Sequence, residues 1–279
     1  MATLRITIDI FSGRPNPVLE LTGRQAREAL ALLKSAGRER ERDLPPVPTL
    51  GYRGLLIERP GARQRQPVRT IHPALEDFVT RSALIRKLAL GREFPSLLRR
   101  EMDRFRELCE RWPSRRHRWP VRHRCRCAPL YEPTWWNDGG QKQLHNNCYN
   151  YASNYRTDTF RVLPDGSQPG AAAGAMYTQL TCASVGPAAV ADGLIARPGA
   201  NNRCPDEGHL VALVIAPGFD FHWYRKGRNG YWSHKPGSTP VVNVDNSNNL
   251  IPDPRSANRG MYTQFCTFMV VMHGHIKIR

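Results

Sequence analysis

The sequence lacks any run of the roughly 18 to 20 apolar residues that a membrane-spanning helix needs, although apolar residues make up 40% of the chain. Residues 1–11 also lack the order of basic, then apolar, then small residues that marks a secretory signal peptide. We therefore expect a soluble chain without a membrane span, which is cytoplasmic or is exported without a Sec-type signal.

Acidic residues are scarce: 24 Asp and Glu stand against 41 Lys and Arg, which gives the 279 residues a net charge of +17. With 23% charged residues, the composition is that of a globular chain rather than a disordered one. The excess is local, because residues 81–127 alone carry a net charge of +10. The basicity is therefore a property of one segment and not of the whole fold.

The basic segment 81–127 predicts a non-enzymatic alternative, the binding of a nucleic acid or an acidic protein. Arginine forks bind phosphates, and Trp119, Trp135 and Trp136 can stack on bases. The competing interpretation is a solvated helix face, because the arginines within 99–111 alternate with acidic residues at helical spacing. The arginines that we expect to contact a polyanion are Arg115, Arg116, Arg118, Arg122 and Arg124.

The chain contains seven cysteines, which is an odd number. A secreted disulfide scaffold is usually smaller and has an even number, so we expect mostly reduced, buried thiols. His123, Cys125 and Cys127 lie close together, but one residue between the cysteines is not the usual spacing of a zinc site. We expect no metal and no cofactor there, and these three residues are the only candidate metal ligands. The alternative is a redox or disulfide pair, or no function.

The N-terminal part, residues 1–112, is expected to form a small α+β accessory module. The predicted strands cover residues 4–11, 54–57 and 68–71, with a turn cluster at 12–17. The predicted helices cover residues 22–37, 73–85 and 94–112. Residues 113–140 are rich in Pro, Trp and Arg, and we predict a linker there.

Residues 141–279 are expected to form a second α+β domain, with helices followed by an antiparallel sheet. The predicted helices cover residues 144–156 and part of 177–194, with a break at Gly186-Pro187. The predicted strands cover residues 210–215, 221–225, 230–235, 239–244 and 264–273, with 210–215 in the centre of the sheet.

The clearest chemical signal is the sequence HNNCYNYA at residues 145–152. Asn146 or Asn147 can cap a helix, which places Cys148 in the first turn. The unpaired N–H groups and the dipole of that turn stabilise a thiolate, and they also stabilise an oxyanion. A nucleophilic cysteine is therefore predicted, and a buried structural thiol is the alternative.

A nucleophilic cysteine needs a base and a group that orients the base. His209 opens the apolar strand at 210–215 and is one candidate base. His222 and His234 share one face if a hairpin turns near Arg228, so they are a second candidate pair. The candidate orienting residues are His222, His234, Asp220, Asn243 and Asp245.

A cysteine at a helix start, a second helical region and a Gly-His-apolar strand resemble the papain-like superfamily, in particular bacterial amidase–peptidases of the CHAP and NlpC type. The resemblance covers roughly residues 141–245. It implies a papain-like fold with the cysteine helix packed on an antiparallel sheet, and peptide or peptidoglycan-like substrates. By motif position it makes Cys148 the nucleophile and His209 the base. Residues 221–254 are unusually rich in Trp, His and Asn, so the third catalytic residue stays open.

The leading prediction is thus a two-domain bacterial cysteine hydrolase, a peptidase or a cell-wall-type amidase, with a Cys–His dyad or triad. Polyanion binding through 81–127 is the non-enzymatic alternative. A third hypothesis is a secreted effector or toxin domain with the same site. The segment 245–249 predicts a polar turn, because it lacks the glycine and glutamate of a calcium-binding loop.

Overall fold

The computed structural model describes residues 3–35, 48–60, 67–81, 83–111, 125–197 and 201–279. It contains helices and two antiparallel sheets, which confirms the α+β class. The chain forms two compact units. Unit 1 consists of residues 1–10, 16–47 and 52–110, and unit 2 consists of residues 11–15, 48–51 and 111–279. Two short N-terminal segments therefore belong to unit 2, whereas the sequence assigned them to the accessory module.

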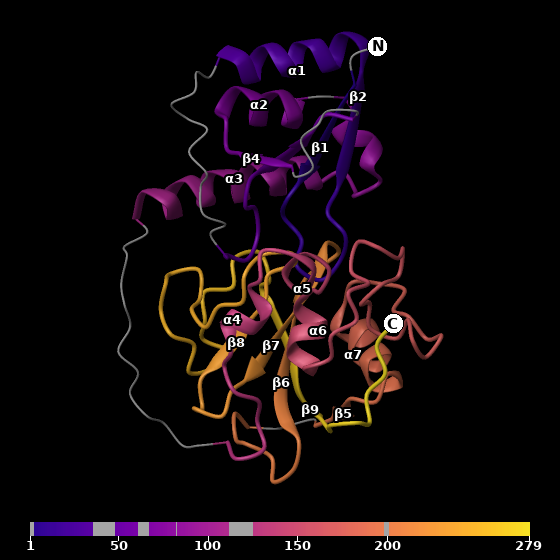
Figure 1. Cartoon of the computed structure of the whole chain (residues 1–279), viewed down its shortest axis with the longest axis vertical. Coiled ribbons are helices and arrows are strands. Elements are labelled where there is room, and N and C mark those ends of the chain that lie inside the picture. Colours follow the sequence, from indigo (N-terminus) through magenta and orange to yellow (C-terminus); the bar gives the residue numbers. More distant parts are fainter. Residues whose placement is uncertain (1–2, 36–47, 61–66, 82, 112–124, 198–200) are drawn as a thin grey trace. The chain divides into compact units, whose positions relative to one another are not determined.

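Unit 1 is a four-stranded antiparallel sheet with helices (Figure 1). Its strands follow the order β2-β1-β3-β4. They are β1 (Thr3–Ile8), β2 (Val18–Thr22), β3 (Leu55–Glu58) and β4 (Val68–Thr70). The helices are α1 (Gly23–Ser35), α2 (Pro73–Arg81), the 3-10 helix η2 (Ile85–Leu88) and α3 (Phe94–Arg111).

β2 was not predicted, because it is short and is joined directly to α1. The signal was present: Leu19 and Leu21 are buried, and the exposed Glu20 lies between them. This is the period-two pattern of a strand with one buried face. β2 pairs with β1, so the turn cluster connects two neighbouring antiparallel strands.

Unit 2 is a five-stranded antiparallel sheet with helices packed against it (Figure 1). The strand order is β5-β9-β6-β7-β8. The strands are β5 (Ile195–Ala196), β6 (His209–Ala216), β7 (Asp220–Lys226), β8 (Trp232–His234) and β9 (Gln264–Val271). The helices are α4 (Pro133–Trp136), α5 (Gln141–Leu144), α6 (Cys148–Ser153) and α7 (Cys182–Ala191). The strand predicted at 210–215 is indeed central, and all eight residues of β6 are buried.

Two expected elements differ in unit 2. Helix α7 runs through Pro187 without a break, so the proline costs the helix one backbone hydrogen bond and does not end it. Residues 239–244 form isolated bridges rather than a strand, through Val242 to His234 and Val244 to Leu250. None of the helices in the described part of the chain has the length and apolar character that a bilayer span requires.

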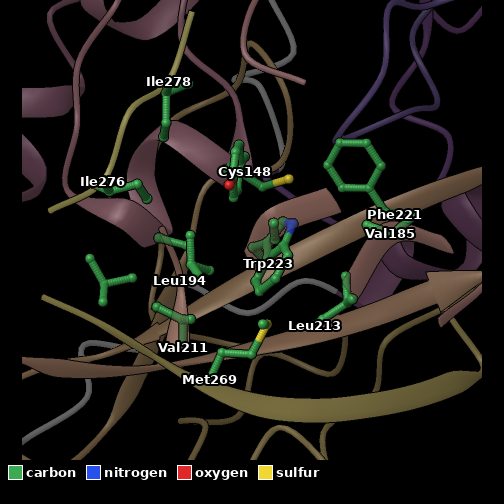
Figure 2. Close-up of a cluster of buried hydrophobic side chains, with 14 of the residues drawn as sticks. Cys148, Val185, Leu194, Val211, Leu213, Phe221, Trp223, Met269, Ile276 and Ile278 are labelled. Carbon is green, nitrogen blue, oxygen red and sulfur yellow. The ribbon is translucent and has the colours of Figure 1, made fainter. Parts of the chain in front are cut away.

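The main core of unit 2 lies between α6, α7 and one face of the sheet (Figure 2). Alternate residues of each strand face this core, as the pleat of a sheet demands. Val211, Leu213 and Ile215 come from β6, and Phe221 and Trp223 come from β7. This alternation decides which candidate site residues are able to meet Cys148.

Candidate functional site

Helix α6 begins with an asparagine cap, and of the two predicted candidates, Asn146 and Asn147, the cap is Asn147. The Asn147 side chain accepts hydrogen bonds from the backbone N–H groups of Tyr149, at 2.9 Å, and Asn150, at 3.2 Å. The Asn150 side chain returns a bond to the Asn147 N–H at 3.0 Å, which completes a capping box. Cys148 is therefore the first residue of the helix.

Cys148 lies in the apolar core and not at a surface cleft. Its side chain is fully buried among residues that include Phe221 and Trp223 (Figure 2). Burial raises the pKa of the Cys148 thiol well above its ordinary value, and the negative charge of Asp220 raises it further. A hydrogen bond from the Trp223 backbone and the charge of Lys235 oppose this rise. The thiol is therefore neutral near pH 7. The position of Cys148 at the start of the helix does not lower the thiol pKa enough to offset the effect of burial.

The three candidate histidines do not reach the cysteine. His222 is next to Trp223 in β7, so its side chain points to the opposite face of the sheet from Cys148. His209 binds the carbonyl oxygen of Ala152 through Nε2 at 2.7 Å, one helical turn beyond the cysteine. Across the described residues of unit 2, no hydrogen bond is seen between the Cys148 sulfur and a histidine nitrogen.

His222 and His234 do share one face, as the hairpin predicted. His222 Nε2 lies 2.9 Å from His234 Nδ1, and His234 Nε2 lies 3.0 Å from the Val244 carbonyl oxygen. A carbonyl only accepts, so His234 carries its proton on Nε2 and accepts at Nδ1 from His222. His234 opposes Tyr224 rather than His222, a shift of two residues that keeps both rings on the same face.

Unit 2 is expected to lose stability as the pH falls from 7.5 to 5. Burial lowers the pKa of His209 to about 3 and the pKa of His234 to about 4. The unfolded chain therefore binds more protons below pH 6.5, and each histidine costs about 2 kcal/mol of stability by pH 5. Urea unfolding followed by tryptophan fluorescence measures the change. Equal unfolding free energies at pH 7.5 and 5 would contradict this expectation.

Asp220 does not orient a histidine; its carboxylate holds the loop at residues 11–15, which belongs to unit 2. It accepts backbone N–H bonds from Ser12 at 2.5 Å, Gly13 at 3.2 Å and Arg14 at 3.0 Å. The Tyr262 hydroxyl donates a fourth bond at 2.5 Å. Burial raises the pKa of Asp220, whereas the hydrogen bonds from Tyr262, Ser12 and Gly13 and the positive charge of Arg14 lower it.

The same loop is held from its other side by two amide side chains. Asn147 Nδ2 donates to the Gly13 carbonyl oxygen at 2.7 Å, and Gln168 Nε2 donates to the same oxygen at 2.9 Å. Asn147 thus caps α6 and fixes the loop at once. Sequence reasoning missed this contact. The available signal was the turn cluster at 12–17, whose glycine allows close approach of the backbone.

Lys235 is a second residue that the sequence analysis missed. It is fully buried, and its ammonium donates to the backbone carbonyl oxygens of Asn146 at 2.7 Å and Gly237 at 2.6 Å. A third bond goes to the Gln143 carbonyl oxygen. These carbonyl acceptors satisfy the hydrogen-bonding capacity of the buried ammonium. Lys235 therefore fixes the segment that leads into α6.

Asp245 forms the polar turn that the sequence favoured. Its carboxylate accepts backbone N–H bonds from Ser247 at 2.9 Å, Asn249 at 3.0 Å and Asn258 at 2.9 Å. Asn243 forms no hydrogen bond with a histidine, and its side-chain nitrogen is buried without a partner. Neither residue is placed to orient a base for Cys148.

The cysteines of unit 2 correct the expectation of mostly reduced thiols. Cys125 is bonded to Cys204, and Cys182 is bonded to Cys266. The free thiols of this unit are those of Cys127, which is exposed, and Cys148, which is buried. The disulfide makes the Cys125 sulfur unavailable as a metal-binding thiolate. The described residues contain no cluster of three or more His, Cys, Asp or Glu that could hold a metal ion.

The predicted polyanion site falls outside the described residues, as do Arg115, Arg116, Arg118, Arg122, Arg124 and His123. In the described part of the basic segment, arginines of α3 pair with carboxylates, two of which are buried. In α3, Arg104 pairs with Glu101 at 2.8 Å, and Arg106 pairs with Asp103 and Glu76, each at 2.7 Å. Binding of a nucleic acid or an acidic protein through 81–127 therefore stays a prediction.

Alkylation of the native chain is expected to separate the two free thiols. Iodoacetamide should modify exposed Cys127, whereas buried Cys148 should react more than about a hundredfold slower, at a rate set by opening of the core. Peptide mass spectrometry of a Cys109→Ala background gives both rates, because the Cys109 side chain lies outside the described residues. Equal rates for Cys127 and Cys148 would show that the sulfur of Cys148 is accessible after all.

No family model and no solved structure matches the chain. A curated protein does match: Insoluble matrix shell protein 1 of Ruditapes philippinarum is 43% identical over 147 residues. The match covers 52% of this chain and 91% of that protein. The matched region is 147 residues long, and unit 1 ends at residue 110. The similarity therefore includes part of the sequence that forms unit 2.

This match overturns the assignment to papain-like enzymes. The prediction of a bacterial CHAP- or NlpC-type cysteine hydrolase is wrong, because the similar protein is a shell matrix protein and no model of a hydrolase family matches. The geometry agrees, since Cys148 is buried in the core and its candidate bases point elsewhere. The chain belongs to the family of proteins that includes Insoluble matrix shell protein 1.

Proposed function

We propose that this chain is a non-enzymatic structural protein of an insoluble extracellular material. The observation that carries the proposal is its 43% identity to Insoluble matrix shell protein 1 over nearly the whole length of that protein. Identity at this level over 147 residues supports a similar role for the shared part of the chain.

The disulfides of unit 2 support an extracellular location. Disulfides form and persist in oxidising compartments and are rare in the cytosol. The bonds Cys125–Cys204 and Cys182–Cys266 join residues that are 79 and 84 positions apart, so each closes a long loop. Cross-links of this span restrict the unfolded chain and stabilise the folded one. A protein that remains outside the cell benefits from this stability.

The hydrogen bonds of the buried polar residues in unit 2 also support a structural role. Asp220, Lys235 and His234 are buried, and each forms hydrogen bonds with backbone groups of other segments. Groups used in this way fix chain segments in place. Asp220 and His234, which were candidate catalytic residues, thus support the fold of unit 2 together with Lys235.

Fractionation of the source organism tests the proposal. An antibody against the chain is used on cell lysate, soluble extracellular material and insoluble extracellular material, with a cytosolic enzyme as the marker of leakage. We expect the chain in the insoluble extracellular fraction, released by denaturant together with reductant. Recovery of the chain with the cytosolic marker, and its absence outside the cells, would refute the proposed function.

A further inference from the structure

Three cysteines of unit 2 are gathered in one surface region. Cys125 and Cys204 form a disulfide, and Cys127 follows Cys125 by two residues. The Cys127 thiol donates to the carbonyl oxygen of Asp206 at 3.2 Å, and Asp206 follows Cys204 by two residues. Both chain segments of the disulfide therefore hold the free thiol beside the bond.

The segment that carries Cys127 is fixed to the sheet. The Cys125 N–H donates to the Arg228 carbonyl oxygen at 3.0 Å, and the Arg228 N–H donates to the Pro129 carbonyl oxygen at 3.0 Å. The Ala128 N–H closes a turn on the Cys125 carbonyl oxygen at 3.1 Å. Cys127 lies within this turn and is exposed. The thiol of Cys127 is therefore exposed to solvent on a segment whose backbone is fixed by these hydrogen bonds.

Among the described cysteines of unit 2, none is available to form a disulfide with Cys127. Four cysteines of the unit are already in disulfides, and Cys148 is fully buried in the core. An exposed thiol left over in a secreted protein is expected to pair outside its own chain. A second copy offers the same disulfide, Cys125–Cys204, as an electrophile for this thiol.

We propose that Cys127 of one copy attacks the Cys125–Cys204 disulfide of another and links the two copies covalently. The attacked sulfur is that of Cys204, because Cys204 is half-buried whereas Cys125 is only 3% exposed. The Cys127–Cys204 bond forms as the Cys125–Cys204 bond breaks. The proton lost by Cys127 is taken up by the departing Cys125 thiolate, so the step needs no oxidant.

The exchange leaves each linked pair with groups that are able to react again. The attacked copy keeps its exposed Cys127, which is able to attack a third copy, while its Cys204 is already used. Each copy thus attacks one neighbour through Cys127 and is attacked once at Cys204. The copies are therefore joined head to tail, and such contacts yield open chains. This inference rests on the proposed function, because the starting disulfide persists only in an oxidising compartment. Covalent linking of many copies in this way explains why the proposed extracellular material is insoluble.

The test uses the full chain, purified without reductant, in oxygen-free buffer with a metal chelator at pH 8. Equal amounts of light and nitrogen-15-labelled protein are mixed, and samples are quenched with N-ethylmaleimide over time. We expect a ladder on non-reducing gels, an unchanged total of free thiols, and Cys127–Cys204 peptides that join a light half to a heavy half. Cys127→Ser should reduce the ladder at least tenfold, whereas Cys148→Ala should leave it unchanged.

Three results would overturn the proposal. They are the absence of a ladder, a Cys127–Cys127 link accompanied by loss of thiols, and a Cys127–Cys204 link found only within single chains. The fractionation experiment does not depend on Cys127. If the chain is found in insoluble extracellular material but forms no ladder, the exchange fails and the proposed function stands. If a ladder forms with a chain that remains inside cells, the proposed function fails.

Discussion

Replacing Asp220 with alanine is expected to lower the free energy of unfolding of unit 2 by about 4 kcal/mol or more. The carboxylate accepts bonds from the backbone of Ser12, Gly13 and Arg14, and one from the Tyr262 hydroxyl. A buried donor that loses its acceptor costs about 1–3 kcal/mol. The thermal midpoint should fall by roughly 10 °C or more for a unit of this size.

The matched control for this change is Asp206→Ala, which removes a carboxylate from an exposed position. It should leave the midpoint within about 2 °C of the parent, as exposed substitutions usually do. Asp220→Asn keeps one acceptor oxygen and should give an intermediate loss. If Asp220→Ala unfolds at the same temperature as Asp206→Ala, the loop at residues 11–15 is not held as described.

Replacing Gly13 with alanine is the second change with a large expected effect. A Cβ atom at this position would lie 2.4 Å from ring carbon Cε2 of Phe221 and 2.5 Å from the Phe221 carbonyl oxygen. The carbonyl belongs to the backbone of β7, so it cannot turn away as a flexible side chain does. We expect a loss of about 3 kcal/mol or more in the free energy of unfolding, measured by urea titration.

Gly186→Ala provides the opposite control for the same type of substitution. Gly186 lies inside helix α7, and a Cβ there would meet no atom within 4 Å. Alanine in a helix interior is about 0.5–1 kcal/mol more stable than glycine, so this variant should gain stability. A Gly13→Ala chain as stable as the parent would show that the loop leaves room beside Phe221.

Strong periodicity explains which elements the sequence predicted. The apolar run at 210–215 becomes the buried central strand β6, and the alternation of Leu4, Ile6 and Ile8 becomes β1. β2 was missed because it is short and joined directly to α1. The loop at 11–15 could not be predicted, since its partner Asp220 lies more than 200 residues away and local patterns carry no such information.

The order of residues along the chain explains why the catalytic prediction failed. A cysteine at a helix start and a histidine on a later strand occur in papain-like enzymes, but order does not determine which face of a strand is buried. Trp223 faces the core beside Cys148, so His222 faces the other way. A helix cap at Asn146 or Asn147 was predicted, and the structure shows that Asn147 is the cap and that Cys148 is buried in the core.

The odd number of cysteines misled the prediction of their redox state. Pairings across 79 and 84 residues leave no mark in local spacing, and connectivity is not deducible from sequence alone. The odd count still contained useful information. It arises because free Cys127 and Cys148 accompany the two disulfides, with Cys109 as the seventh cysteine.

A disulfide map of the chain recovered from its natural location tests the central claim most directly. Material is alkylated with N-ethylmaleimide at collection, digested without reduction and analysed by mass spectrometry. The structural, extracellular role predicts Cys182–Cys266 in every copy, and Cys204 bonded either to Cys125 or to Cys127 of another copy, in material from outside the cell. Recovery of Cys125, Cys182, Cys204 and Cys266 as alkylated thiols in the intracellular fraction would contradict it.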